Sequence, residues 1–193
     1  MDYRFLFQRI RYIILNPPVA WEIIKRENRP VKDPRNNFFL PLIVLVSISA
    51  FAGSMFFTNS TLEPVYSLFA AVKYFILNLA VVYASTVILG EITKALDLGK
   101  DFRVSFKLIV YSLAPMFICQ VVSLLFESLI FVNILSLYGL YIFWYGAQTM
   151  LNPPEHKKMP MLVATVVVVS GFYIAGSVVL SSILDRVYFA FFS

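Results

Sequence analysis

The stretch MLVATVVVVSGFYIAGSVVLSSIL, residues 161–184, contains no charged side chain. A helix rises about 1.5 Å per residue, so about 20 such residues cross a hydrocarbon core of about 30 Å. We therefore expect this stretch to span a membrane. Four more stretches are similarly apolar, at about 38–57, 65–90, 106–126 and 129–151, and their only charged residues are Lys73 and Lys107.

The composition of the whole chain agrees with these stretches. Of 193 residues, 60% are hydrophobic and only 14% are charged, and the mean hydropathy is +0.78. A soluble domain has a more even balance. We predict an all-α polytopic membrane protein, with five transmembrane helices in residues 38–184, an external tail at 185–193, and cytoplasmic amphipathic helices with a linker at 1–37.

The basic residues indicate which way the chain crosses the membrane. Thirteen of the 16 Lys and Arg flank the predicted spans on one side. They are Arg4, Arg9, Arg11, Lys25, Arg26, Arg29, Lys32, Arg35, Lys94, Lys100, Arg103, Lys157 and Lys158. Cytoplasmic loops carry an excess of basic residues, so we expect the N-terminus inside and the C-terminus outside. The net charge of +5 is thus explained by orientation rather than by nucleic-acid binding.

The first fifteen residues have the pattern of a basic amphipathic helix. Leu6, Phe7, Ile10 and Ile13 recur at helical spacing, with Arg4 and other polar residues opposite. Such a helix either lies in the anionic headgroup layer or packs on the bundle. Trp is favoured at membrane interfaces. The candidate face for anionic lipid or a partner comprises Arg4, Arg9, Arg11, Trp21, Lys157 and Lys158.

The triplet Asn-Pro-Pro occurs twice, at 16–18 and at 152–154. An Asn side chain can accept a hydrogen bond from the first N–H groups of a helix, and Pro fits the first helical position. We therefore expect helices to begin at Pro17 and Pro153, with Glu155 completing a capping box at the second copy.

Polar residues share faces within the predicted spans. The candidate intramembrane site comprises Lys73, Asn78, Tyr111, Gln120, Tyr138, Tyr141, Tyr145 and Gln148. Two interpretations remain open, hydrogen bonds inside a packed bundle and a polar pathway. Lys73 either attracts an anion or extends to the outer interface. Pro115 should kink the third span, because it removes a backbone hydrogen bond.

The sequence carries little that suggests catalysis. No Asp or Glu lies inside a predicted span, Cys119 is the only cysteine, and His156 has no partner at metal-ligand spacing. No hydrolase, phosphate-binding or dinucleotide motif is present. We therefore predict a protein that is not an enzyme, with no cofactor and no metal.

Three pieces of sequence resemble the Yip family of Ypt-interacting membrane proteins, in particular its short bacterial members. They are NPPVAW at 16–21, SFKLIVYSLAP at 105–115 and LYGLYIFWYGAQTMLNPPEHKK at 137–158. Tyr111 and Pro115 match the family's Tyr-x-x-x-Pro element, Tyr138 and Gly146 its aromatic fourth span, and Pro154 and Lys157 its following loop. The resemblance covers most of the chain and implies five spans with a cytoplasmic N-terminus.

The family resemblance also implies a kind of function. Eukaryotic members look like adaptors of the secretory pathway that contact prenylated Rab-type GTPases, but this chain lacks their Asp-Leu-Tyr-Gly-Pro element. We expect a non-enzymatic membrane scaffold or adaptor, in the inner membrane if the source is bacterial. The alternative is a transporter or permease-like component for a small or lipidic substrate, which would use spans two to four. A homo-oligomer or a membrane-protein partner would serve either function.

Overall fold

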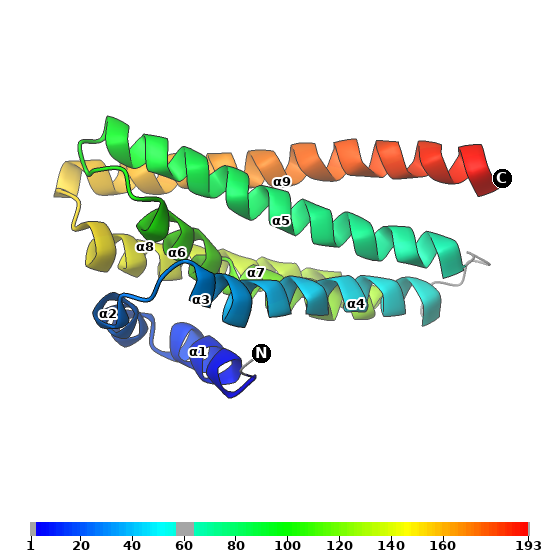
Figure 1. The fold of residues 1–193 in the computed structure, drawn as a ribbon, viewed down its shortest axis with the longest axis horizontal. Helices are drawn as coiled ribbons and strands as arrows, with labels where there is room; N and C mark the ends of the chain where they lie inside the picture. Colours follow the sequence, from blue (N-terminus) through cyan, green and yellow to red (C-terminus); the bar gives the residue numbers. More distant parts are fainter. Residues whose placement is uncertain (1–2, 57–63, 193) are drawn as a thin grey trace.

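The computed structural model describes residues 3–56 and 64–192. This part of the chain forms helices and turns, and no strand occurs in it. Two short helices, α1 (Tyr3–Leu15) and α2 (Pro17–Glu27), precede five antiparallel passes (Figure 1). Within residues 3–56 and 64–192, five helices are long and apolar enough to cross a membrane. The predicted all-α fold with five spans is confirmed.

The passes contain the following elements. The first is α3 (Lys32–Pro34), the π-helical η1 (Arg35–Phe39) and α4 (Leu40–Phe56), and the second is α5 (Pro64–Ala95). The third is α6 (Phe102–Ser112) and α7 (Ala114–Leu125), the fourth is η2 (Glu127–Leu137) and α8 (Tyr138–Leu151), and the fifth is α9 (Glu155–Phe192). The predicted first span ends at Phe57, which lies outside the described residues, as do Met1, Asp2 and Ser193 of the predicted flanks.

One end of the bundle gathers the two short helices, the α5–α6 connection and the α8–α9 turn (Figure 1). The thirteen flanking basic residues named above lie in these segments, in the linker and first turns that follow α2, or in the adjoining turns of α5, α6 and α9. We call this end the basic end. The C-terminus lies at the opposite end, as five passes require.

The two Asn-Pro-Pro triplets have different structures. The Asn16 side chain accepts a hydrogen bond from the Val19 N–H at 3.5 Å, and α2 begins at Pro17 as predicted. Asn152 instead ends α8 in the left-handed conformation, with φ of 46°, and α9 begins only at Glu155. The prediction of a helix start at Pro153 was wrong. Asn tolerates the left-handed region better than most residues, so it serves as a C-terminal cap here.

The third pass is interrupted just before Pro115. Helix α6 ends at Ser112 and α7 begins at Ala114, with Leu113 between them at φ −82° and ψ 0°. Pro115 lies in the first turn of α7, where a missing N–H is tolerated. The structure therefore places the break two residues before the proline.

The fourth pass is not a continuous α-helix. Its first half, η2, is a 3-10 helix, with Leu129 outside helical geometry. The Asn133 side chain donates to the Ile130 carbonyl and the Ser136 hydroxyl donates to the Asn133 carbonyl, both three residues back. Side-chain bonds of this kind compete with the α-helical backbone pattern. Because both bonds reach a carbonyl three residues back, they fit a helix with three residues per turn.

The buried core lies toward the basic end, where α2, η1, α6 and α8 meet. Its largest fully buried side chains include Trp21, Phe38, Phe39, Phe106 and Phe117. Helix α9 contributes Met161 to this core and packs mainly along α5 (Figure 1). Its other sides expose a series of apolar residues, Val163, Val167, Ile174, Val178 and Ile183. A bilayer would cover such a surface.

Candidate functional site

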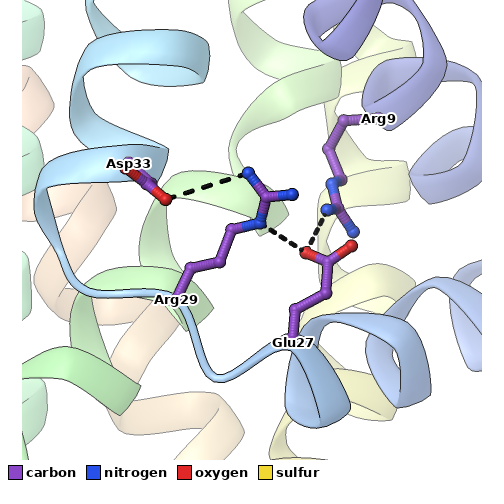
Figure 2. A network of polar contacts seen from close by, with 4 residues as sticks. All are labelled: Arg9, Glu27, Arg29 and Asp33. Atoms are coloured by element: carbon purple, nitrogen blue, oxygen red, sulfur yellow. Dashed lines mark hydrogen bonds and ion pairs between the residues drawn. The ribbon is translucent and has the colours of Figure 1, made fainter.

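A network of charged side chains joins α1 to α2 and to the start of the first pass (Figure 2). Arg9 Nη2 lies 2.5 Å from Glu27 Oε2, and Arg29 Nε lies 3.1 Å from the same oxygen. Arg29 also approaches Asp33, at 3.8 Å. The Arg9 side chain is only 6% exposed. Arg9 was predicted to bind lipid or a partner at the surface, but here it holds α1 in place.

Trp21 was predicted for the same surface and is also buried. Its side chain is 0% exposed, and its indole N–H donates a 2.9 Å hydrogen bond to the Ile142 carbonyl in α8. Its ring meets the Tyr111 ring edge-on, with centroids 5.9 Å apart. Trp21 therefore anchors α2 on the bundle and is not available to a membrane interface.

The two lysines after α8 have partners within the chain. Lys157 Nζ donates to the Leu96 carbonyl and to Asp97 Oδ2, at 2.5 and 3.3 Å. Lys158 Nζ lies 2.6 Å from Glu155 Oε1. Lys157 therefore ties the α8–α9 turn to the end of α5. Their charges lie at the basic end as expected, but carboxylates partly neutralise them.

The outer face of α1 remains open to the surroundings. It consists of Arg4, Phe7, Gln8, Arg11, Tyr12 and Leu15, all exposed and spaced at three or four residues. Phe7 is 74% exposed and Leu15 is 71% exposed. The opposite face of α1 packs on the protein through Ile13, with Leu6 and Ile10 beside it. The sequence left open whether α1 faces the membrane or packs on the bundle. In the structure, some of its apolar residues pack on the bundle and the others are exposed on its outer face.

A second polar site links three passes inside the bundle. Asn78 Nδ2 of α5 donates to Gln120 Oε1 of α7 at 3.1 Å, and Gln120 Nε2 donates to the Tyr173 hydroxyl of α9 at 3.1 Å. Beside them is a cavity of ≈ 480 Å³, and its lining includes Tyr74, Gln120 and Tyr173. Uncharged hydrogen-bonding groups thus meet deep inside the bundle.

The remaining members of the predicted intramembrane site lie elsewhere. Tyr111 packs against Phe38, with centroids 4.8 Å apart. The Tyr138 hydroxyl donates to the Ile14 carbonyl of α1 at 2.8 Å. The ring of Tyr141 contacts those of Tyr138 and Tyr145, with centroids 5.4 and 4.9 Å away.

Lys73 and Gln148, the last two residues of the predicted intramembrane site, are also not part of the Asn78–Gln120–Tyr173 network. Lys73 Nζ lies 5.4 Å from the centre of the Tyr74 ring, and Gln148 is half-buried in α8. Neither lines the cavity of ≈ 480 Å³. The structure therefore brings Asn78 and Gln120 together and groups the three tyrosines of α8 elsewhere. The other three side chains of the predicted site lie apart from both groups.

The described residues form five antiparallel passes, with an aromatic fourth pass and an N-terminal helix pair that Trp21 anchors. The sequence profile described as the Yip1 domain matches residues 11–178. The chain belongs to the Yip1 domain family. The match covers more than half of the chain. Together with the five apolar helices of the described residues, it identifies the chain as an integral multi-pass membrane protein. No curated protein and no solved structure matches it.

The Yip1 domain match begins inside α1 and ends inside α9. It includes Trp21, Glu27 and the Asn78–Gln120–Tyr173 network, whereas Arg4 precedes it. In the part of the Yip1 domain that the structure describes, no three His, Cys, Asp or Glu side chains come together as a metal site.

Sequence reasoning missed several polar residues of this Yip1 domain. Tyr173 completes the intramembrane network, and Asn133 and Ser136 line the cavity beside it. A signal was available, because Asn133 and Ser136 are three residues apart in the apolar stretch ESLIFVNILSL. Glu27 could not be identified as the partner of Arg9 in this way, since it lies 18 residues away in the sequence.

Proposed function

We propose that this Yip1 domain protein is a non-enzymatic membrane scaffold that engages anionic lipid through the outer face of α1. The observation that carries the proposal is the joint exposure of Arg4 and Arg11 with Phe7 and Leu15 on one side of that helix. No ion pair involves either arginine among the residues described. Exposed apolar and basic groups on one helix face suit the boundary between headgroups and acyl chains.

The charge distribution supports a cytoplasmic position for this face. The basic end carries thirteen of the 16 Lys and Arg, and cytoplasmic segments next to spans are rich in these residues. The cytoplasmic leaflet is also the more anionic one. We therefore propose that the N-terminus is inside and the C-terminus outside, in the inner membrane if the source is bacterial.

The anchoring of α1 and α2 supports a scaffold role. The Arg9–Glu27 ion pair and the Trp21–Ile142 hydrogen bond hold both helices against the basic end. Helices fixed in this way present their outer face without a further ordering cost, which favours binding. A partner protein that approached the membrane surface there would meet a preformed surface.

The alternative, a permease-like pathway through spans two to four, has less support. Such a pathway requires the tyrosines of α8 to lie next to Asn78 and Gln120, so that polar side chains line one continuous route. Tyr138 instead bonds the carbonyl of Ile14 at the basic end, and Tyr141 is exposed on the outside of α8. The polar residues therefore belong to separate places in the fold.

The scaffold proposal can be tested by native mass spectrometry of the full chain released from nanodiscs containing phosphatidylglycerol and phosphatidylcholine. The double variant Arg4→Gln, Arg11→Gln removes the two exposed charges of α1. Each basic residue near an anionic surface contributes about 1 kcal/mol, so phosphatidylglycerol binding should weaken by about 30-fold.

The matched control is Arg26→Gln, Lys32→Gln. It removes the same charge from exposed residues at the same end of the molecule, outside α1. Phosphatidylglycerol retention close to that of the unmodified chain is expected for this control. Equal retention by both double variants would refute a role for the outer face of α1.

A further inference from the structure

Two adjoining cavities lie along α9, separate from the outer face of α1. The cavity of ≈ 480 Å³ lies against α5, α7 and η2, and a second cavity of ≈ 160 Å³ lies against α6 and α8. Met116, Ser136, Val169 and Ser170 line both. The shared lining shows that the two cavities adjoin each other, and we call the pair the α9 groove.

The groove carries many hydrogen-bonding groups and no charge. Tyr74, Gln120, Ser123, Asn133, Ser170 and Tyr173 all line its larger part. Neither part is lined by Asp, Glu, Lys, Arg or His. A charged ligand group would be desolvated there without a counter-ion, which is costly inside a bilayer. The groove therefore suits an uncharged polar group.

The 3-10 geometry of η2 directs polar side chains into the groove. In a helix with three residues per turn, residues three apart lie in one row. Ile130, Asn133 and Ser136 form such a row, and all three line the larger cavity. The row beside it, with Phe131, Ile134 and Leu137, is more than half exposed. One side of η2 thus offers hydrogen bonds, and a neighbouring side offers an apolar surface.

A buried hydroxyl in the smaller cavity has no partner. Ser112 is 5% exposed, its Oγ makes no hydrogen bond within the described chain, and it lines this cavity. Buried polar groups are rarely left unsatisfied, so each such group suggests a missing partner. Ser112 lies at the break between α6 and α7, at the far side of the groove from Gln120.

The depth of the groove limits what can reach it. Tyr173 lies about 18 Å along α9 from Met161, where the uncharged stretch begins, which is close to the middle of a 30 Å hydrocarbon core. A ligand that reaches this depth must itself be soluble in the bilayer. It must also carry uncharged hydroxyl or carbonyl groups to satisfy the lining.

We propose that the α9 groove binds a neutral amphiphile of the diacylglycerol type. Its hydroxyl and ester groups would bond with Gln120 and Asn133, and with Ser112 once that side chain turns toward the cavity. Its acyl chains would lie along the apolar surfaces of η2 and α9. Phospholipids are excluded as ligands of the groove, because their phosphate would meet no cation there. The site is independent of α1, so the failure of either proposal leaves the other standing.

The test uses the full chain in phosphatidylcholine nanodiscs and a photoreactive diacylglycerol with a diazirine in its acyl chain. We expect saturable labelling that maps to η2 and α9. Unlabelled dioleoylglycerol should compete for the site, and dioleoyl phosphatidylglycerol should not. Competition by both lipids to the same extent would overturn the proposal.

Two variants test where the probe binds. Ser170→Phe fills the groove from α9, and Ser182→Phe makes the same change at an exposed position of α9 that lines neither cavity. Saturable labelling should be lost in the first and kept in the second. Equal labelling of the two variants would contradict the proposal.

A milder variant guards against misfolding of Ser170→Phe. Asn133→Val keeps the size of the side chain and removes its hydrogen bonds, so half-saturation should need about tenfold more probe. Unchanged half-saturation would refute the assigned role of Asn133 and with it the groove. Efficient disulfide cross-linking between two copies through Ser170→Cys, in a Cys119→Ala background, would also overturn the proposal, because a second chain would then occupy the groove.

Discussion

The indole N–H of Trp21 donates a hydrogen bond to the carbonyl oxygen of Ile142, 121 residues away in the sequence. The contact joins the N-terminal helix pair to the fourth pass. One turn after Ile142, Gly146 leaves the space that the indole ring occupies, since an added Cβ would lie 2.5 Å from two ring atoms. The position of α2, and through Arg9 that of α1, depends on this fit.

Replacing Gly146 with Ala should therefore displace α2. The new methyl group would overlap a fully buried ring, and overpacking of this kind costs about 1–3 kcal/mol. We expect a lower midpoint in unfolding by SDS and faster hydrogen exchange in α2. Gly171→Ala is the control, because an added Cβ there meets nothing within 4 Å. A similar midpoint for both variants would show that the contact is unimportant.

Arg9 and Arg11 should respond differently to the same substitution. Arg9→Gln leaves Glu27 without its closest partner in a partly buried position, and the free energy of unfolding should fall by about 1–3 kcal/mol. Arg11→Gln changes an exposed residue and should stay within about 0.5 kcal/mol. A double-mutant cycle with Glu27→Gln measures the coupling, and a coupling near zero would contradict the tether assigned to Arg9.

Gln120→Leu should loosen the contact among α5, α7 and α9. It removes the bonds to Asn78 and Tyr173, and interhelical hydrogen bonds in membranes average about 0.6 kcal/mol each. We expect a loss of about 1–2 kcal/mol in SDS unfolding. Ser182→Ala, which removes only a bond to the Val178 carbonyl within α9, should change little. Equal losses in the two variants would count against the network.

Much of the fold could be predicted because membrane spans depend on local composition. The five apolar stretches and the helix start at Asn16 required only the residues in each segment. The second Asn-Pro-Pro shows the limit, since Asn152 closes the preceding helix rather than opening the next one. The triplet follows a helix in both places and still adopts both structures, so local sequence does not decide between them.

The candidate sites were harder to predict because they depend on partners distant in sequence. Exposed and buried arginines look alike in a basic amphipathic pattern, so Arg9 and Arg11 could not be told apart without Glu27. Trp21 likewise has the composition of an interface residue, and only its contact with α8 reveals a buried anchor. The 3-10 conformation of η2 was also missed, and with it the row of Asn133 and Ser136.

The position of α1 relative to the membrane is the central claim, and a spin label at Phe7→Cys in a Cys119→Ala background tests it most directly. Collisions with oxygen and with a water-soluble nickel chelate are compared in nanodiscs containing phosphatidylglycerol. Glu155→Cys is the reference, because Glu155 is 89% exposed and lies outside the uncharged stretch of α9. We predict that oxygen dominates at Phe7 and the nickel chelate at Glu155. Equal access of the nickel chelate to both positions would contradict the account.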